Sequence, residues 1–334
     1  MHSASARPAT RRRFLGTTFA AGLGLGLAAC GSDDDNKNAG AADPDAPWTF
    51  VDDRHKRVRL DRRPTRVVCL TDTTTAALWA AGLRPVGGAD NGTGITTAAH
   101  VDFARARKIS DKDGEIDPEA LAALRPDLLI DAVQADGKLQ AISTTPKLAD
   151  LAPAVGLDVY RPVEQIVATA DHLTTALGAE LADGAAKARY AAAADALRRA
   201  TRGNPELRVG FVFGMGADGV GVMNPRTWAV LKTVAALGVN LVRVPSGADN
   251  LYSRRISWER VGDIPADLLV WAVPDPLPTQ RIWKAAPAVA AGQVWKPALP
   301  SWYAYTYDNF ALLLSGLAEH VATARPGVGP GAGA

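Results

Sequence analysis

The chain of 334 residues carries 37 lysines and arginines against 35 aspartates and glutamates, and 47% of its residues are hydrophobic. Four basic residues precede Cys30, so the chain without that segment has 33 basic and 35 acidic residues and a net charge of −2. This balance excludes nucleic acid as an expected partner. The length exceeds what one hydrophobic core usually supports and favours two domains.

Residues 1–29 have the pattern of an export signal. The segment Thr10–Gly16 resembles a twin-arginine motif, and an apolar run follows up to Ala29. This run is shorter than the roughly twenty residues that a membrane-spanning helix needs. It ends in Leu-Ala-Ala-Cys, which is similar to a bacterial lipobox. We therefore expect cleavage before Cys30, lipidation of this cysteine, and a protein anchored at the extracytoplasmic face of the cell membrane.

Residues 30–47 are rich in Asp, Asn, Ala and Gly and contain few apolar side chains, which predicts a disordered tether. Cys69 is the one other cysteine, and it lies in an apolar run that predicts a buried strand. No disulfide is expected within the mature chain.

The first predicted lobe covers residues 48–180. A capping loop at Thr71–Thr75 should precede a helix at Ala76–Ala81. Strands are predicted at Arg66–Leu70, Pro85–Ala89, Asp127–Ala132 and Leu157–Tyr160. Strands that alternate with helices indicate a mostly parallel sheet covered on both faces.

Two segments of the chain are diverged copies of one another. Ile116–Val133 and Ile256–Val273 align without gaps and are identical at seven of eighteen positions. Each copy predicts a short helix, a turn and an apolar strand that follows an aspartate. The repeat therefore predicts two similar lobes.

The most helical stretch, Asp183–Arg202, lies between the copies, and we expect a single bridging helix over residues 181–203. The second lobe should cover residues 204–323, and a glycine-rich, disordered tail should cover residues 324–334. Its strands are predicted at Arg208–Phe213, Val220–Met223 and Gln293–Lys296, and its helices at Thr227–Leu237 and Asn309–Ala322. The predicted fold is α/β, with two Rossmann-like lobes of mostly parallel sheets joined by a single long helix.

The lipobox, the repeated lobes and the helical bridge together resemble the class III substrate-binding proteins of ABC importers. The most specific segments are Arg66–Gly87, Pro118–Ile130 and Trp283–Trp295, and the resemblance covers Trp48–Val321. It implies a monomeric binding protein, without enzyme activity or a cofactor, that captures a ferric siderophore and presents it to an ABC permease dimer with its ATPase. Haem and cobalamin are the alternative ligands of this family. Iron would be held by the chelator, so no metal site on the protein is implied.

In this family a glutamate on each lobe docks into arginine pockets of the permease. The matching positions are Glu119 and Glu259, which the repeat keeps at the same place in both copies. Two equivalent carboxylates suit two equivalent sites on a dimeric permease. The alternative is that both are acids favoured at a helix start by the macrodipole.

Ligands of open α/β sheets bind beyond the carboxyl ends of the strands, and aromatic side chains gather in the loops predicted there. Aromatic walls suit large planar chelates, and arginines suit anionic ones. The ligand-binding candidates are Thr71, Asp72, Asn91, Gln134, Met215, Tyr252, Arg254, Arg255, Trp271, Trp302, Tyr303 and Tyr305. Thr71 and Asp72 have an alternative role as caps of the first helix. The alternative for Trp271 is packing in the core. One of the two arginines has the alternative of a solvent-exposed side chain without ligand contact.

Other classes of function have weaker support. Gly214–Gly219 matches a dinucleotide fingerprint, but a predicted strand follows it where a helix is required. The histidines are scattered at no ligand spacing, which disfavours a receptor for bare metal ions. No G-x-S-x-G elbow occurs, and a lipid-anchored enzyme is a distant second class. The sequence does not choose between an anionic siderophore, which the arginines would suit, and a neutral hydroxamate, which the tyrosines would suit.

Overall fold

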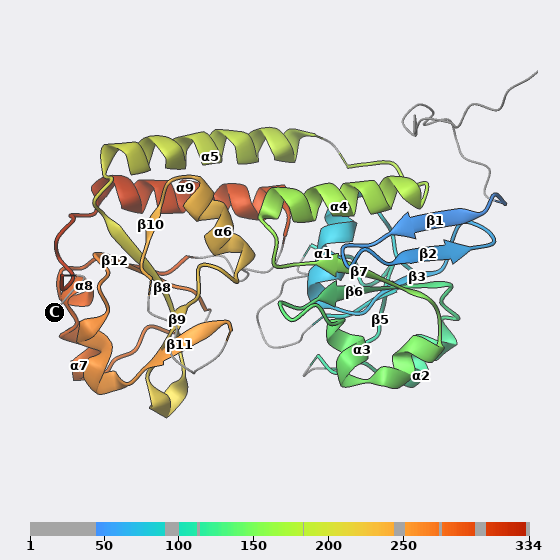
Figure 1. Ribbon diagram of the computed structural model, residues 1–334, viewed down its shortest axis with the longest axis horizontal. Coiled ribbons are helices and arrows are strands. Elements are labelled where there is room, and N and C mark those ends of the chain that lie inside the picture. The colour runs from blue at the N-terminus through green and yellow to red at the C-terminus, as the bar shows by residue number, and fades with distance from the viewer. Residues whose placement is uncertain are drawn as a thin grey trace, which may run out of the picture. The chain divides into compact units, whose positions relative to one another are not determined.

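A computed structural model of the chain describes residues 45–90, 100–111, 114–182, 184–243, 251–273, 276–297 and 305–331. The predicted signal peptide, Cys30 and most of the predicted tether lie outside these ranges. The described elements form two α/β lobes, each built on its own sheet (Figure 1). Within the described ranges, no helix has both the length and the apolar composition that crossing a bilayer requires.

The first lobe contains an entirely parallel sheet, as predicted. Its strands lie in the order β5 (Arg107–Lys108), β4 (Gly87–Gly88), β3 (Val67–Cys69), β6 (Leu128–Val133) and β7 (Ala154–Asp158). Every residue of β3 and β6 is buried, including Cys69. Continuous apolar runs are typical of parallel strands that are covered on both faces.

An antiparallel hairpin that we did not predict opens this lobe. It consists of β1 (Trp48–Val51) and β2 (Arg57–Leu60). Trp48 and Phe50 point from it into the first lobe's core. The helices of the lobe are α1 (Asp72–Ala81), α2 (Pro118–Ala123), α3 (Gln140–Thr144), the 3-10 helix η1 (Pro146–Asp150) and α4 (Val163–Ala176).

The second lobe is built on a mixed sheet. Its strands lie in the order β11 (Ser253–Ile256), β9 (Val220–Met223), β8 (Arg208–Gly214), β12 (Leu268–Trp271) and β13 (Val294–Trp295), with β10 (Asn240–Leu241) also beside β8. The pairs β8–β9 and β9–β11 are antiparallel, and the others are parallel. The helices are η2 (Gly216–Asp218), α6 (Ala229–Ala236), η3 (Trp258–Asp263), α7 (Arg281–Lys284), α8 (Pro287–Ala290) and α9 (Tyr307–Thr323).

The repeat has a structural basis in its two aspartates. Asp127 accepts a hydrogen bond of 2.8 Å from the backbone N–H of Arg66, at the start of β3. Asp267 accepts one of 2.9 Å from the backbone N–H of Arg208, at the start of β8. In each lobe the aspartate therefore ties the strand of the repeat to its neighbour.

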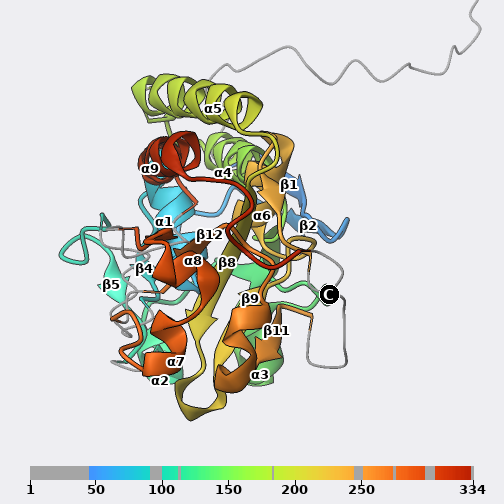
Figure 2. The same cartoon turned by 90° about the vertical axis from the view of Figure 1, so that its left-hand side faces the viewer.

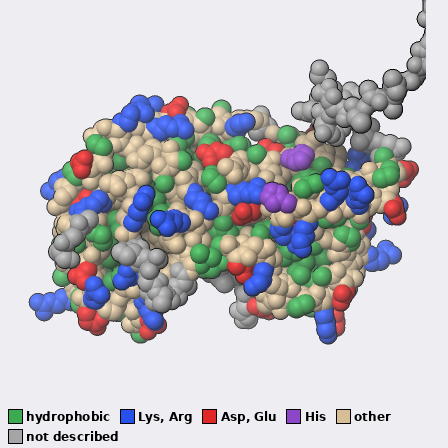
Figure 3. All heavy atoms as spheres, in the orientation of Figure 1, with side chains coloured by type: hydrophobic (Ala, Val, Ile, Leu, Met, Phe, Trp, Pro, Cys, Tyr) green, Lys and Arg blue, Asp and Glu red, His purple; other side chains and the backbone are tan. Residues whose placement is uncertain are grey.

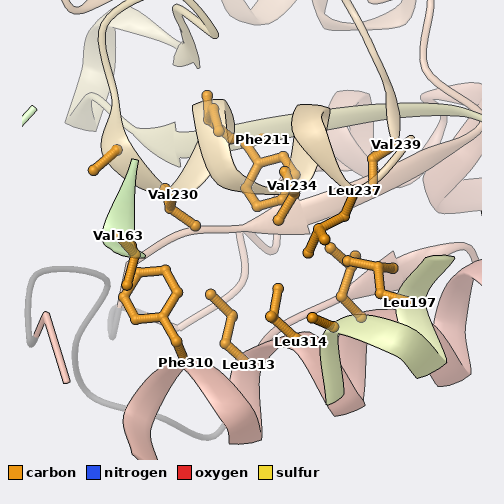
Figure 4. Packing of buried hydrophobic residues seen from close by; sticks show 14 of the residues in the cluster. Val163, Leu197, Phe211, Val230, Val234, Leu237, Val239, Phe310, Leu313 and Leu314 are labelled. Atoms are coloured by element: carbon orange, nitrogen blue, oxygen red, sulfur yellow. The ribbon is translucent and has the colours of Figure 1, made fainter. Parts of the chain in front are cut away.

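The helix predicted between the lobes is present as α5 (Ala185–Gly203), which lies along α9 (Figures 1 and 2). The preceding helix α4 contributes to two hydrophobic clusters. Val163 and Ile166, near its start, pack with second-lobe residues, and Figure 4 shows Val163 beside Phe310. Ala170 and Leu173, nearer its end, pack in the first lobe's core. The apolar face of α4 thus continues from one core into the other.

The end of the chain corrects the prediction of a disordered tail, because residues 324–331 are anchored to the second lobe. The N–H of Gly329 donates to the carboxylate of Asp267 at 2.9 Å, and the guanidinium of Arg208 donates to the carbonyl oxygen of Gly329 at 2.8 Å. Glycine-rich composition suggested disorder, but here the missing side chain lets the backbone lie against the sheet.

Replacing Gly329 with alanine should therefore destabilise the second lobe. A Cβ at this position would lie 2.2 Å from the carbonyl oxygen of Ala266, so the tail must shift away from its partners. Forced overpacking typically costs about 1–3 kcal/mol, and we expect a loss of this size in the free energy of unfolding measured in urea. Gly331→Ala is the matched control, because nothing lies within 4 Å of its Cβ position. Equal stability of the two variants would contradict the anchored tail.

Candidate functional site

A pocket lies at the carboxyl ends of β3 and β4 in the first lobe. Its volume is about 150 Å³. We call it the first-lobe pocket. Its polar lining includes the carboxylates of Asp72, Asp90 and Glu115. It also includes the hydroxyls of Thr71, Thr144 and Thr145 and the amide of Gln140. Because all strands of this sheet are parallel, their carboxyl ends meet at one edge, where open α/β sheets bind ligands.

Thr71 and Asp72 belong to this lining and also begin α1. The hydroxyl of Thr71 accepts a hydrogen bond from the N–H of Thr74 as the N-cap, which is the capping role considered above. The carboxylate of Asp72 accepts one of 2.8 Å from the N–H of Thr73. Both side chains are mostly buried, so capping fixes the orientation of groups that also line the pocket.

Asp90, two residues beyond the end of β4, was not among the predicted site residues. Its carboxylate Oδ2 lies 3.1 Å from the ammonium of Lys108. Its other oxygen, Oδ1, is buried and has no hydrogen-bond partner in the described part of the chain. The backbone of Asp90 is fixed by Ser110, whose Oγ accepts from its N–H and donates to its carbonyl oxygen. A polar residue immediately after a predicted strand was the available sequence signal.

Three half-buried aromatic rings from both lobes meet beside the carboxyl end of β7. Tyr160 of the first lobe lies 5.9 Å from Trp228 and 5.6 Å from Tyr252, and the last two lie 5.6 Å apart, measured between ring centroids. We call these residues the aromatic trio. The indole N–H of Trp228 donates to the carbonyl oxygen of Tyr252 at 2.7 Å, and Lys232 donates to that of Tyr160. Of the three, only Tyr252 was predicted.

Trp271 and Tyr305, two further candidates, lie in the hydrophobic core. Each is 2% exposed. The ring of Trp271 contacts that of Trp283 at 5.5 Å, and the ring of Tyr305 stacks on Phe310 at 6.2 Å. For Trp271 this geometry favours core packing, the alternative considered above.

The two candidate arginines line a separate pocket of about 380 Å³ at the end of β11, which we call the second-lobe pocket. Arg254 is half-buried in its wall. Arg255 is exposed and lies 3.5 Å from the carboxylate of Asp218. Ser257 and Arg260 complete the polar lining. The two arginines therefore lie in the same pocket, but they do not line the first-lobe pocket.

Gln134 and Met215 line neither pocket. Gln134 and Met215 are half-exposed, and each directly follows a central strand. The N–H of Gln134 donates to Lys138, and that of Met215 donates to Gly219, so both begin tight turns. Three candidates lie outside the described residues, namely Asn91, Trp302 and Tyr303.

Comparison with known proteins identifies the family. A sequence model described as periplasmic binding protein matches residues 67–296, more than half of the chain. The chain belongs to the periplasmic binding protein family. A search of curated proteins gave no match.

Solved structures of periplasmic binding proteins are similar to this chain over most of its length. DesE of Streptomyces coelicolor, a ferric-siderophore receptor protein, is 30% identical, with a TM-score of 0.70 over 83% of this chain and 99% of DesE. SirA of Staphylococcus aureus, solved with staphyloferrin B, is 17% identical, with a TM-score of 0.59 over 83% and 99% of the two chains. FhuD of Vibrio cholerae, solved with Fe³⁺-Desferal, is 18% identical, with a TM-score of 0.56 over 79% and 99%. These relatives are binding proteins rather than enzymes.

The two glutamates of the repeat occupy matching positions in this periplasmic binding protein. Glu119 lies in the first turn of α2, and Glu259 in the first turn of η3, and both are exposed. Hydrogen bonds from its own backbone N–H and from Ser257 hold the pKa of Glu259 below its usual range, so the side chain is charged at neutral pH.

On the face seen in Figure 3, acidic and basic side chains are interspersed. Among the described residues, no group of three or more His, Cys, Asp or Glu side chains is arranged to hold a metal ion.

Proposed function

We propose that this protein captures a ferric siderophore outside the cytoplasm and delivers it to an ABC permease. The observation that carries the proposal is the likeness to DesE, a ferric-siderophore receptor that matches 83% of this chain at 30% identity. SirA and FhuD, whose structures hold staphyloferrin B and Fe³⁺-Desferal, share the fold.

The geometry of the candidate site is consistent with this ligand. The aromatic trio offers ring surface from both lobes, and large chelates bind to aromatic walls through apolar contact and stacking. The first-lobe pocket adds oriented polar groups at the carboxyl edge of the sheet. We assign ligand contact to Thr71, Asp72 and Tyr252, and, outside the described residues, to Asn91, Trp302 and Tyr303.

The location follows from the N-terminal segment. The twin-arginine motif, the short apolar run and the lipobox support export and a lipid anchor on Cys30 at the extracytoplasmic face. The matching family is described as periplasmic binding protein, and this description is consistent with a location outside the cytoplasm. We propose that the protein acts as an anchored monomer.

The proposed partner is a dimeric permease with its ATPase. Glu119 and Glu259 are exposed, carry the same charge and stand at equivalent points of the two lobes. Complementary charge orients and accelerates such an encounter more than it adds affinity.

The test of the ligand is a titration of intrinsic tryptophan fluorescence with ferric siderophores, haemin and cyanocobalamin. Trp228 lies in the aromatic trio, so a bound iron complex should quench its emission. We expect saturable quenching by at least one ferric siderophore at one site per chain.

A further inference from the structure

The charges around the two glutamates of the repeat differ in sign between the lobes. Residues 114–121 contain three carboxylates and no basic side chain, whereas the aligned residues 254–261 contain three arginines and one carboxylate. In this alignment Arg255 stands in the place of Glu115. The repeat therefore keeps one glutamate in each lobe and reverses the charge beside it.

The side chains of opposite charge are accessible in both lobes. Glu115 is exposed, and the side chains of Arg255 and Arg260 are 53% and 67% exposed. Along the chain, each lies within four residues of Glu119 or Glu259. A protein surface that reaches the two glutamates therefore also meets these charges.

The second-lobe pocket lies directly beside Glu259. Its basic lining consists of Arg254, Arg255 and Arg260. Ser257 also lines the pocket, and it hydrogen-bonds the carboxylate of Glu259. Guanidinium groups bind carboxylates through paired, charge-assisted hydrogen bonds. The pocket is therefore suited to an acidic side chain of a partner that also contacts Glu259.

Nearby acids do not prevent this use of the arginines. Arg255 lies 3.5 Å from the carboxylate of Asp218, and Arg260 lies 2.9 Å from that of Asp263. All four side chains are more than half exposed. Ion pairs in contact with water contribute little to stability, so these arginines can exchange their acids for carboxylates of a partner at small cost.

We propose that the permease has two different subunits, one of which presents acidic side chains to the second-lobe pocket while the other presents basic side chains to Glu115. This inference rests on the proposed function and on docking through Glu119 and Glu259. A homodimer would present the same surface to both lobes, because its subunits are related by a two-fold axis. One surface cannot complement arginines at one lobe and a carboxylate at the other, and like charges that meet across an interface are costly. The reversed charges therefore select one of two docking orientations.

Photo-cross-linking in whole cells tests which subunit meets which lobe. A photoreactive benzophenone amino acid replaces either Ala122 or Gly262, which are aligned in the repeat. Ala122 is exposed, and no atom lies closer than 4.0 Å to the Cβ position of Gly262, so both positions accept a larger side chain. Mass spectrometry of the linked peptides should find one permease subunit joined to position 122 and a different one joined to position 262. Linkage of both positions to a single kind of subunit would overturn the proposal.

A variant that transposes the charges shows whether they cause the orientation. Glu115→Arg combined with Arg255→Glu should lower uptake of radioactive iron about tenfold, because each lobe then faces like charge. The iron is supplied on the tightest-binding siderophore of the titration panel, and the affinity of the purified variant for this complex should be unchanged. Normal uptake by the variant would show that the reversed charges do not orient docking.

The matched control transposes an exposed ion pair outside the repeat. Asp195 and Arg198 lie 2.7 Å apart on α5, and Asp195→Arg combined with Arg198→Glu should transport iron like the wild-type protein.

The outcomes separate this inference from the proposed function. Cross-links to the permease from neither position would overturn both the subunit assignment and the docking role of the glutamates. Binding of ferric siderophores by the purified protein is measured independently. Its failure would overturn the proposed ligand but not the assignment of two different subunits to the two lobes.

Discussion

Replacing both Glu119 and Glu259 with alanine should abolish siderophore uptake by cells while leaving the affinity of the purified protein for its ligand unchanged. Both side chains are exposed at the start of short helices, so neither supports the core. Two carboxylates at equivalent points of two similar lobes match two equivalent sites on a permease dimer. Uptake of radioactive iron by cells and fluorescence titration of the same variant measure the two effects.

The control for the docking variant is a second pair of exposed glutamates, Glu180 and Glu206, which lie outside the repeat. Their double alanine variant should transport iron like the wild-type protein. If the Glu119 and Glu259 variant also transports normally, both residues are no more than acids at helix starts. If it loses ligand affinity as well, the defect lies in binding rather than in docking.

Replacing Asp267 with alanine should cause the largest loss of stability among single substitutions in the second lobe. Asp267 is fully buried and accepts hydrogen bonds from the backbone and guanidinium of Arg208 and from the N–H of Gly329. Removing one partner of a buried ion pair costs about 3–5 kcal/mol, because the other charge is left without compensation. Urea unfolding measures this loss.

The repeat supplies the matched control, Asp127→Ala. Asp127 is half-exposed and accepts hydrogen bonds from the backbone N–H groups of Thr65 and Arg66. The guanidinium of Arg66 does not pair with Asp127 but donates to the carbonyl oxygen of Leu124. Its loss should cost about 1–2 kcal/mol, as expected for hydrogen bonds that water can partly replace. Equal destabilisation of the two variants would show that the ion pair and the anchored tail contribute little.

Acid unfolding gives a second readout for Asp267. Burial alone would raise the pKa of this carboxyl, but the hydrogen bonds from Arg208 and Gly329 outweigh it and hold the pKa below its usual value of 3.8. The folded state therefore binds this proton less readily than the unfolded state. The stabilisation is present above pH 3.8 and should be lost as the pH falls through the lower folded-state value.

Much of the fold followed from local sequence patterns. Continuous apolar runs predicted β3 and β6, and Thr71 marked the start of α1, whereas the short strand β5 was not predicted. The anchored tail was not predicted because a glycine-rich composition indicates only a flexible backbone. It does not reveal the hydrogen bonds that Asp267 and Arg208 make with the backbone of Gly329.

Helix α4 was not predicted, and neither were its two roles. The spacing of Val163, Ile166, Ala170 and Leu173 is typical of an amphipathic helix and was the available signal. The tertiary arrangement decides which hydrophobic core each end of α4 packs into.

Part of the candidate site lies where parallel strands end. Thr71 and Asp72 were selected from this position and line the first-lobe pocket, and the same rule could have selected Asp90. Tyr160 was assigned to a predicted strand, whereas β7 ends at Asp158. Trp228 could not be found in this way, because its neighbours Tyr160 and Tyr252 are distant in sequence. Trp271 ends a strand whose residues are all buried, so it packs in the core.

The central claim is that this periplasmic binding protein captures a ferric siderophore, and the fluorescence titration of the purified protein tests it most directly. We expect one ferric siderophore to quench emission saturably at one site per chain, while its iron-free form, haemin and cyanocobalamin bind more weakly. Saturable binding of haemin or cyanocobalamin alone, or no binding by any ferric siderophore, would contradict the account.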